Sequence, residues 1–168
     1  EKSAIPTDIG STSHASDFCY MTSHDKLTCF TSTYSREFYK SRGNFIEIGG
    51  MEVARKGDDA QVQELLRKVG SGKAFGTNAH MITAAEAKER FPLLEEDTIE
   101  CAMWDPDAGL VTPRSQKVAG DLVDEAVAAG KLQAFPYTPA EEIIVEDGRA
   151  VGVKTAKGTI MADHVVLC

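Results

Sequence analysis

The sequence lacks an excess of positive charge. Its 18 lysine and arginine residues are outnumbered by 26 aspartate and glutamate residues, which gives a formal net charge of -8. A protein that binds nucleic acid normally presents a basic face to the phosphates, whereas the basic residues here are scattered along the chain. We therefore expect no nucleic-acid partner.

Long hydrophobic runs are also lacking. No segment approaches the roughly 20 apolar residues that cross a bilayer, so we expect no membrane partner. The four cysteines are widely spaced and form neither a C-x-x-C pair nor a disulfide framework, which favours a reducing, cytoplasmic setting. Cys19, His24 and Cys29 lack the short ligand pairs of zinc sites, so we expect no metal site.

What is present is the composition of a globular domain. Hydrophobic residues make up 42% of the 168 residues and charged residues 26%, enough for a buried core. The chain begins at Glu1 and stops inside the apolar run 165–168, Val-Val-Leu-Cys, which is typical of a buried parallel strand. We expect it to be an internal piece of a longer polypeptide.

The first predicted helix follows Asp25, a candidate N-cap, and runs to about residue 41. Apolar residues recur along it at spacings of three and four. They predict one buried face, made by Leu27, Phe30, Tyr34 and Phe38.

Three further helices are predicted from signals at their ends. Each begins at a capping residue and stops at a glycine or before a proline. Their expected limits are Asp58 to Gly70, Thr83 with its capping-box partner Glu86 to Phe91-Pro92, and Thr112-Pro113 to Gly130.

Alternating apolar residues predict the strands. Segments 45–48 and 51–53 flank Gly49-Gly50, which predicts a hairpin. Strand 100–104 leads into a turn at 105–109, whose aspartates we interpret as structural because aspartate in such turns bonds its own backbone. An antiparallel meander is expected from segments 142–145, 150–155 and 159–161.

A run of small and hydroxyl residues near the start is a candidate cofactor loop. Backbone amides and hydroxyls in such a run can approach a hydrogen-bonding ligand, and the run delivers one imidazole. Serine, threonine and glycine also cap helices and fill solvated turns, so that alternative stays open. The residues are Gly10, Ser11, Thr12, Ser13, His14 and Ala15.

This run, with Glu1-Lys2 ahead of it, resembles the second half of the FAD-binding region in D-amino-acid-oxidase-like flavoproteins. The dimethylglycine oxidases, dimethylglycine dehydrogenases and sarcosine dehydrogenases are the most similar members. Segments 48–54, 105–109, 148–153 and 160–168 also resemble that family.

The resemblance implies a role for each matching residue. Glu1 would bond the ribose of the FAD adenosine, with Lys2 following it on the same edge. Residues 10–13 would lie along the flavin, and His14, followed by Ala15, stands where related enzymes attach the flavin covalently through a neutral ring nitrogen. Ala140 and Glu141 would meet the adenine through their backbone.

The expected fold class is α/β, as part of a Rossmann-like FAD-binding domain with inserted helices and an antiparallel meander. Residues 1–24 would contact FAD and residues 25–131 would lead toward a substrate domain. Residues 132–168 would form the meander and a strand that returns to the FAD domain.

The implied activity is oxidation of the C–N bond of a small-molecule amine, dimethylglycine or sarcosine, with FAD. Alternatives are a related enzyme acting on another amine, a D-amino acid or glycerol 3-phosphate. A different alternative is that the isolated chain is an inert module, without flavin, that self-associates through exposed apolar faces.

Overall fold

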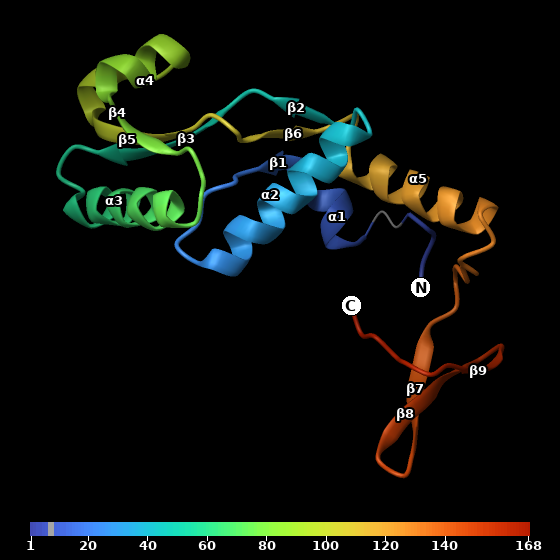
Figure 1. Cartoon of the computed structure of the whole chain (residues 1–168). Coiled ribbons are helices and arrows are strands. Elements are labelled where there is room, and N and C mark those ends of the chain that lie inside the picture. Colours follow the sequence, from blue (N-terminus) through green and yellow to red (C-terminus); the bar gives the residue numbers. More distant parts are fainter. Residues whose placement is uncertain (7–8) are drawn as a thin grey trace. The chain divides into compact units, whose positions relative to one another are not determined.

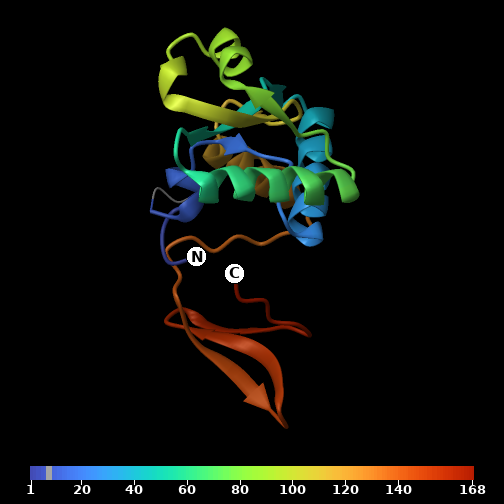
Figure 2. The same ribbon diagram turned by 90° about the vertical axis from the view of Figure 1, so that its left-hand side faces the viewer.

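The structure of the chain is a computed structural model that describes residues 1–6 and 9–168. It divides into two compact units, one formed by residues 1–15 with 115–168 and the other by residues 16–114 (Figures 1 and 2). The three segments expected from the sequence were defined by their relation to a cofactor and a substrate domain, and that division stays a prediction.

The unit of residues 16–114 contains two small antiparallel sheets with helices around them. The sheet orders are β1-β6-β2 and β3-β5-β4. Its elements are β1 Phe18–Cys19, α2 Lys26–Ser41, β2 Phe45–Glu47, β3 Gly50–Arg55, α3 Asp59–Ala74, β4 His80–Thr83, α4 Ala84–Arg90, the 3-10 helix Glu96–Thr98, β5 Ile99–Asp105 and β6 Gly109–Val111.

The strands on either side of Gly49 exist, but the predicted hairpin between them is wrong. Glu47 pairs with Gly109 in one sheet, while Gly50 pairs with Asp105 in the other. The amides of Ile48 and Gly49 both donate to the carbonyl of Ala108, at 3.3 and 2.9 Å. The two segments therefore pair one after the other with the stretch of chain that contains β5 and β6. Gly49, with its φ of 73°, is the residue at which the chain passes from one sheet to the other.

The core of this unit lies on both faces of sheet β3-β5-β4. Met103 of β5 packs toward α3, where Leu65 is fully buried. Its neighbour Ala102 points to the opposite face and contacts Ala87 of α4. Figure 1 shows α3 and α4 on opposite sides of the sheet.

The predicted N-caps of these helices are confirmed. The Asp25 carboxylate accepts the amide of Thr28 at 2.8 Å, and that of Asp58 accepts the amide of Gln61 at 3.1 Å. Thr83 and Glu86 form the complete capping box. The predicted end of α3 at Gly70 is wrong, because an interior glycine costs a helix only about 1 kcal/mol and packing around Leu65 outweighs it.

The apolar face predicted to bury α2 is exposed instead. Phe30 and Tyr34 are 64% and 68% exposed, whereas Cys29 on the opposite side is buried. The inward side also carries Arg36, whose side chain is only 15% exposed and lies among carboxylates. Polar and ionic contacts, which hydrophobic periodicity does not report, decide how this helix faces the sheets.

The unit of residues 1–15 and 115–168 contains two helices and the predicted meander. The meander is confirmed in the order β7-β8-β9, with the Asp147-Gly148 turn at φ values of 49° and 77°. The elements are α1 Ser11–His14, α5 Ser115–Ala128, β7 Ala140–Glu146, β8 Arg149–Thr155 and β9 Gly158–Met161.

Both ends of α5 test a prediction. Gly130 closes the helix as expected, with a φ of 67° and its amide bonded to Val127. The start predicted at Thr112 is wrong, because the amide of Thr112 donates to Asn44 at 2.9 Å and its carbonyl accepts the Asn44 side chain at the same distance. The helix begins at Ser115.

The buried strand predicted at residues 165–168 does not form. Val166 and Leu167 are 80% and 88% exposed. A strand needs a neighbour for its backbone groups, and no strand in the described part of the chain pairs with this segment. Among the described residues, no helix is long and apolar enough to cross a bilayer.

Candidate functional site

The first three residues are held against the segment that precedes β7. The amide of Thr138 donates to the carbonyl of Glu1 at 2.8 Å, and that of Tyr137 to the carbonyl of Ser3 at 3.0 Å. The amino group of Glu1 donates to the carbonyl of Phe135 at 3.2 Å. Backbone bonds therefore fix the position of Glu1 and Lys2 relative to the meander.

The carboxylate of Glu1 is exposed and stays ionised. Its Oε1 atom accepts the backbone amide of Ser3 at 3.1 Å and the Ser3 hydroxyl at 3.0 Å. These two hydrogen bonds, the backbone one first, lower the pKa of the Glu1 carboxyl below its ordinary value. At neutral pH the group is a hydrogen-bond acceptor for a hydroxyl-bearing ligand.

A cavity of about 680 Å³ lies beside Glu1. Three of the residues implicated by the sequence line it: Glu1, Lys2 and Ala140. Its remaining walls are mainly apolar and come from α5, the segment after it, the meander and the end of the chain. They include Val123, Leu132, Phe135, Val153, Ile160 and Leu167.

A smaller cavity of about 280 Å³ shares Glu1 with the first. Thr12 of the candidate loop lines it, opposite Ala119 and Val123 of α5. Glu1 and Thr12 therefore face a common space, and Val123 borders both cavities.

Residues 11–14 form one turn of helix rather than an extended loop. Gly10 is its N-cap, and the Ser13 hydroxyl donates back to the carbonyl of Gly10 at 2.8 Å. The side chain of His14 is exposed at the end of this turn. Among the described residues, Gly10, Ser11, Ser13, His14 and Ala15 line neither cavity.

Ala140 and Glu141, which the resemblance predicts to lie beside the adenine, begin strand β7. Ala140 pairs with Thr155 of β8, and both residues face the larger cavity. The register of the two strands shifts between Ala140 and Glu142, so Glu141 lies in an irregular step. Glu141 is exposed and, unlike its neighbour Ala140, does not line the cavity.

The larger cavity fits the adenosine part of the dinucleotide expected from the resemblance. It offers an ionised carboxylate for ribose hydroxyls and apolar walls for a base. Its volume lies within the roughly 300–1,000 Å³ of ligand pockets. The sequence contains no Gly-x-Gly-x-x-Gly turn.

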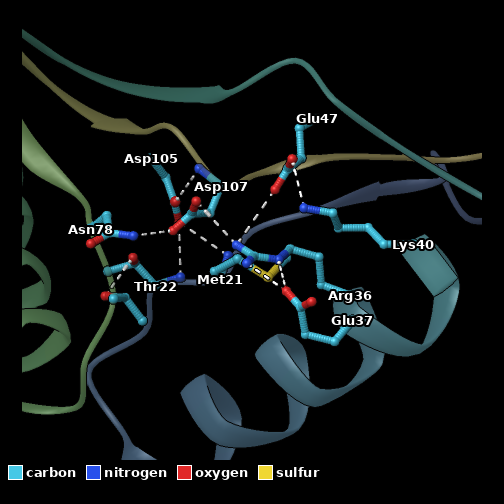
Figure 3. Close-up of polar contacts among 10 residues, drawn as sticks. Met21, Thr22, Arg36, Glu37, Lys40, Glu47, Asn78, Asp105 and Asp107 are labelled. Carbon is cyan, nitrogen blue, oxygen red and sulfur yellow. Dashed lines mark hydrogen bonds and ion pairs between the residues drawn. The ribbon is translucent and has the colours of Figure 1, made fainter.

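The other concentration of charged groups surrounds Asp105 (Figure 3). This aspartate is fully buried, and its Oδ2 atom accepts the amides of Met21 at 3.0 Å and Thr22 at 2.9 Å. Its Oδ1 atom accepts the amide of Asp107 at 3.2 Å. The structural role predicted for this aspartate is confirmed.

Arg36 joins α2 to the same region. Its guanidinium contacts Asp107 at 3.1 Å and Glu47 at 3.7 Å, and it donates to the neighbouring Glu37 (Figure 3). Burial opposes the positive charge, but these carboxylates outweigh burial and raise the pKa of Arg36. Arg36 therefore ties α2 to the carboxylates of Glu47 and Asp107.

Tyr20 lies close to Asp105, and its phenol is not a base. Its hydroxyl donates to the carbonyl of Met51 at 2.6 Å. Burial, followed by the negative charges of Glu52 and Asp105, raises the pKa of Tyr20 to about 12. The phenol is therefore protonated at neutral pH, and the cluster offers no acid–base pair.

Sequence reasoning missed the residues between α5 and β7 that form a wall of the larger cavity. Leu132, Phe135 and Thr138 lie in a segment without helix or strand periodicity. Their only signal in the sequence was the presence of two large apolar side chains where a solvated loop is expected.

Comparison with known proteins assigns the family. The model of the FAD dependent oxidoreductase (DAO) family matches residues 10–168, nearly the whole chain. The chain belongs to this family. The predicted α/β fold class is confirmed, because the mixed structure with antiparallel sheets matches that of an FAD-binding fragment of a D-amino-acid-oxidase-like protein.

Relatives of this DAO-family chain include amino-acid oxidoreductases. Mitochondrial sarcosine dehydrogenase of Homo sapiens is 27% identical over 139 residues, which are 80% of this chain and 15% of that protein. L-proline dehydrogenase from P. horikoshii is 27% identical with a TM-score of 0.77, and the match covers 91% of this chain and 41% of that one. Glycine oxidase from Geobacillus kaustophilus, at 22% identity and a TM-score of 0.72, shares the fold over 97% of this chain and 45% of that one.

We predict that Asp105→Asn destabilises the fold by about 1–3 kcal/mol, because asparagine keeps one acceptor oxygen of the two and its NH2 group must face either the amide of Asp107 or the amides of Met21 and Thr22. Urea unfolding monitored by circular dichroism measures the loss. The matched control is Asp97→Asn at an exposed position, for which we expect a change within about 0.5 kcal/mol. Equal effects of the two substitutions would contradict a role for the buried carboxylate.

Proposed function

We propose that this chain is part of an FAD-dependent oxidoreductase that oxidises the C–N bond of a small N-alkylated amino acid. The observation that carries the proposal is the larger cavity, which brings Glu1, Lys2 and Ala140 together from opposite ends of the sequence. Membership of the DAO family and the sarcosine dehydrogenases among its relatives support it. The chain spans 15% of the human relative, so the activity is proposed for a longer protein.

The residues of this chain hold the adenosine side of the cofactor. The Glu1 carboxylate accepts hydrogen bonds from ribose hydroxyls, and Lys2 places a cation on the same edge. The apolar walls around Val153 and Ile160 exclude water from the base. When bound, FAD supplies the two-electron acceptor for oxidation of the amine.

Sarcosine and dimethylglycine are the preferred substrate candidates, because the curated relatives are named for sarcosine. L-proline is the second candidate. The L-proline dehydrogenase is 27% identical to this chain, and proline, like sarcosine, carries its nitrogen as a secondary amine. Sarcosine and L-proline are both small secondary amines that carry a carboxylate, whereas dimethylglycine is a tertiary amine.

His14 is proposed as the residue that attaches the flavin. Its imidazole is exposed at the end of α1 and is therefore accessible to a ligand.

The 168-residue chain alone is proposed to be inactive and free of flavin, because it supplies the adenosine side of the site without the glycine-rich phosphate turn. A cytoplasmic setting also remains part of the proposal. Four free cysteines fit a reducing compartment, whereas the mammalian relatives are by name mitochondrial.

The proposed activity predicts that the longer protein, loaded with FAD and kept free of oxygen, loses its yellow absorbance on addition of sarcosine or dimethylglycine. Oxidation of the C–N bond to an iminium removes a hydride, with its two electrons, from the carbon next to nitrogen, and bound FAD would accept it. L-proline tests the second candidate, and a D-amino acid and glycerol 3-phosphate serve as comparison substrates. A loaded protein that keeps its colour with every amine would contradict the proposal.

Attachment at His14 predicts that flavin stays with the acid-precipitated protein and is released to the supernatant in the His14→Ala variant. The absorbance of the two fractions after centrifugation measures the outcome. His80→Ala changes another exposed histidine, in the unit of residues 16–114, and should retain the flavin. Release from the unsubstituted protein would show that the cofactor is bound without a covalent link.

The role of Glu1 predicts that Glu1→Gln weakens FAD binding by about tenfold or more, because a charge-assisted hydrogen bond is worth about 1.5–3 kcal/mol. The measurement is the Kd of FAD in the His14→Ala background, where no covalent link hides the equilibrium. Glu141→Gln is the matched control, since Glu141 lies outside the cavity, and its Kd should not change. Equal weakening by both substitutions would remove Glu1 from the site.

A further inference from the structure

Helix α2 carries an apolar stripe that the fold does not use. The stripe consists of Leu27, Phe30, Tyr34 and Phe38, which are between 40% and 70% exposed. The opposite side of the helix, with the buried Cys29, faces its own unit. An apolar patch of a few hundred Å² is ordinary in size for a monomer, but the largest such patch on a protein is often functional.

The side chains of the stripe are ordered relative to one another. The rings of Phe30 and Tyr34 stack with centroids 6.2 Å apart. The guanidinium of Arg42 lies over the ring of Phe38, 5.5 Å from its centroid. Ordered aromatic rings lose little conformational entropy when a partner covers them, which suits a binding surface.

The spacing of the stripe matches a second helix. Its residues follow one another at intervals of three and four, so they form a nearly straight row about 16 Å long on the 16-residue helix. A row of this shape packs well against another helix that runs alongside it.

Charged residues beside the stripe indicate which helix packs against it. At about 100° per residue, Lys26 and Glu37 lie on the same side of the stripe, one near each end of α2. Both are exposed, although Glu37 also accepts hydrogen bonds from Arg36. The stripe therefore has a positive end and a negative end along one border.

This charge pattern is self-complementary in one orientation. If two copies of α2 run antiparallel about a two-fold axis, the same borders meet in reverse order, and Lys26 of each copy lies near Glu37 of the other. In a parallel pair about a two-fold axis, opposite borders of the stripe face each other, so Lys26 and Glu37 of the two copies lie on opposite sides of the seam and do not pair.

We propose that α2 is a self-association surface, on which a second copy of this chain packs its own stripe in antiparallel orientation. An aromatic side chain buries roughly 150–250 Å², so the exposed fractions correspond to a stripe of about 400 Å² per copy. Two stripes bury about 800 Å² together, which is below the roughly 1,000 Å² of a stable interface. The dimer is therefore weak and its population depends on concentration.

The first experiment measures the oligomeric state of the 168-residue chain by sedimentation equilibrium over a range of concentrations. The unsubstituted chain shifts from monomer to dimer as concentration rises, and the double variant Phe30→Ser with Tyr34→Ser stays monomeric. Both residues are exposed in the monomer, so circular dichroism should show an unchanged fold. The control Val166→Ser with Leu167→Ser removes other exposed apolar side chains and dimerises as before.

A charge exchange tests the orientation. Lys26→Glu and Glu37→Lys each place like charges at both ends of the interface and raise the dimer Kd about tenfold. An equimolar mixture of the two single variants restores attraction at both ends and regains dimer, which a fold defect in either variant would not produce.

Three results would overturn the proposal: an unsubstituted chain that stays monomeric at every concentration, single variants that dimerise normally, or a mixture that stays monomeric. In the first case, the stripe would instead contact another part of a longer polypeptide or a different protein.

Discussion

The buried carboxylate of Asp105 is the contact on which the arrangement of residues 16–114 depends. It accepts three backbone amides, two of them from residues 21 and 22, which lie far from it in the sequence. A buried charge is tolerated only when its hydrogen bonds are made, and these bonds place the chain before α2 against the end of β5. The neighbouring Asp107 then receives Arg36, so α2 is oriented by the same turn.

This orientation explains why α2 shows its aromatic residues outward. A guanidinium that is removed from water needs its carboxylate partners, and Glu47 and Asp107 lie on one side of the helix only. Turning the apolar stripe inward would move Arg36 away from both. The helix therefore keeps its ionic contacts and leaves the rings exposed.

Local signals in the sequence predicted local structure well. Asp25, Asp58 and Thr83 cap helices because each cap needs only a side chain and an amide three residues on. Strand pairing failed at Gly49-Gly50, because the choice between a hairpin and two sheets is made by residues more than 50 positions away. No property of the glycine pair distinguishes these outcomes.

In the candidate site, too, some residues could be predicted from the sequence and others could not. Resemblance identified Glu1, Lys2 and Ala140, but the cavity also needs the segment between α5 and β7, which carries no periodic signal. The buried strand expected at residues 165–168 failed for a related reason, since a strand is defined by its neighbour and not by its own composition.

The order of the segments along the chain has a consequence for how such a protein diversifies. Residues 16–114 are inserted between the two parts of the other unit, and every residue that lines the two cavities lies outside the insertion. Mutations in the inserted unit therefore leave the lining of those cavities untouched. Selection can therefore alter the inserted unit without changing the residues that line the cavities of the other unit.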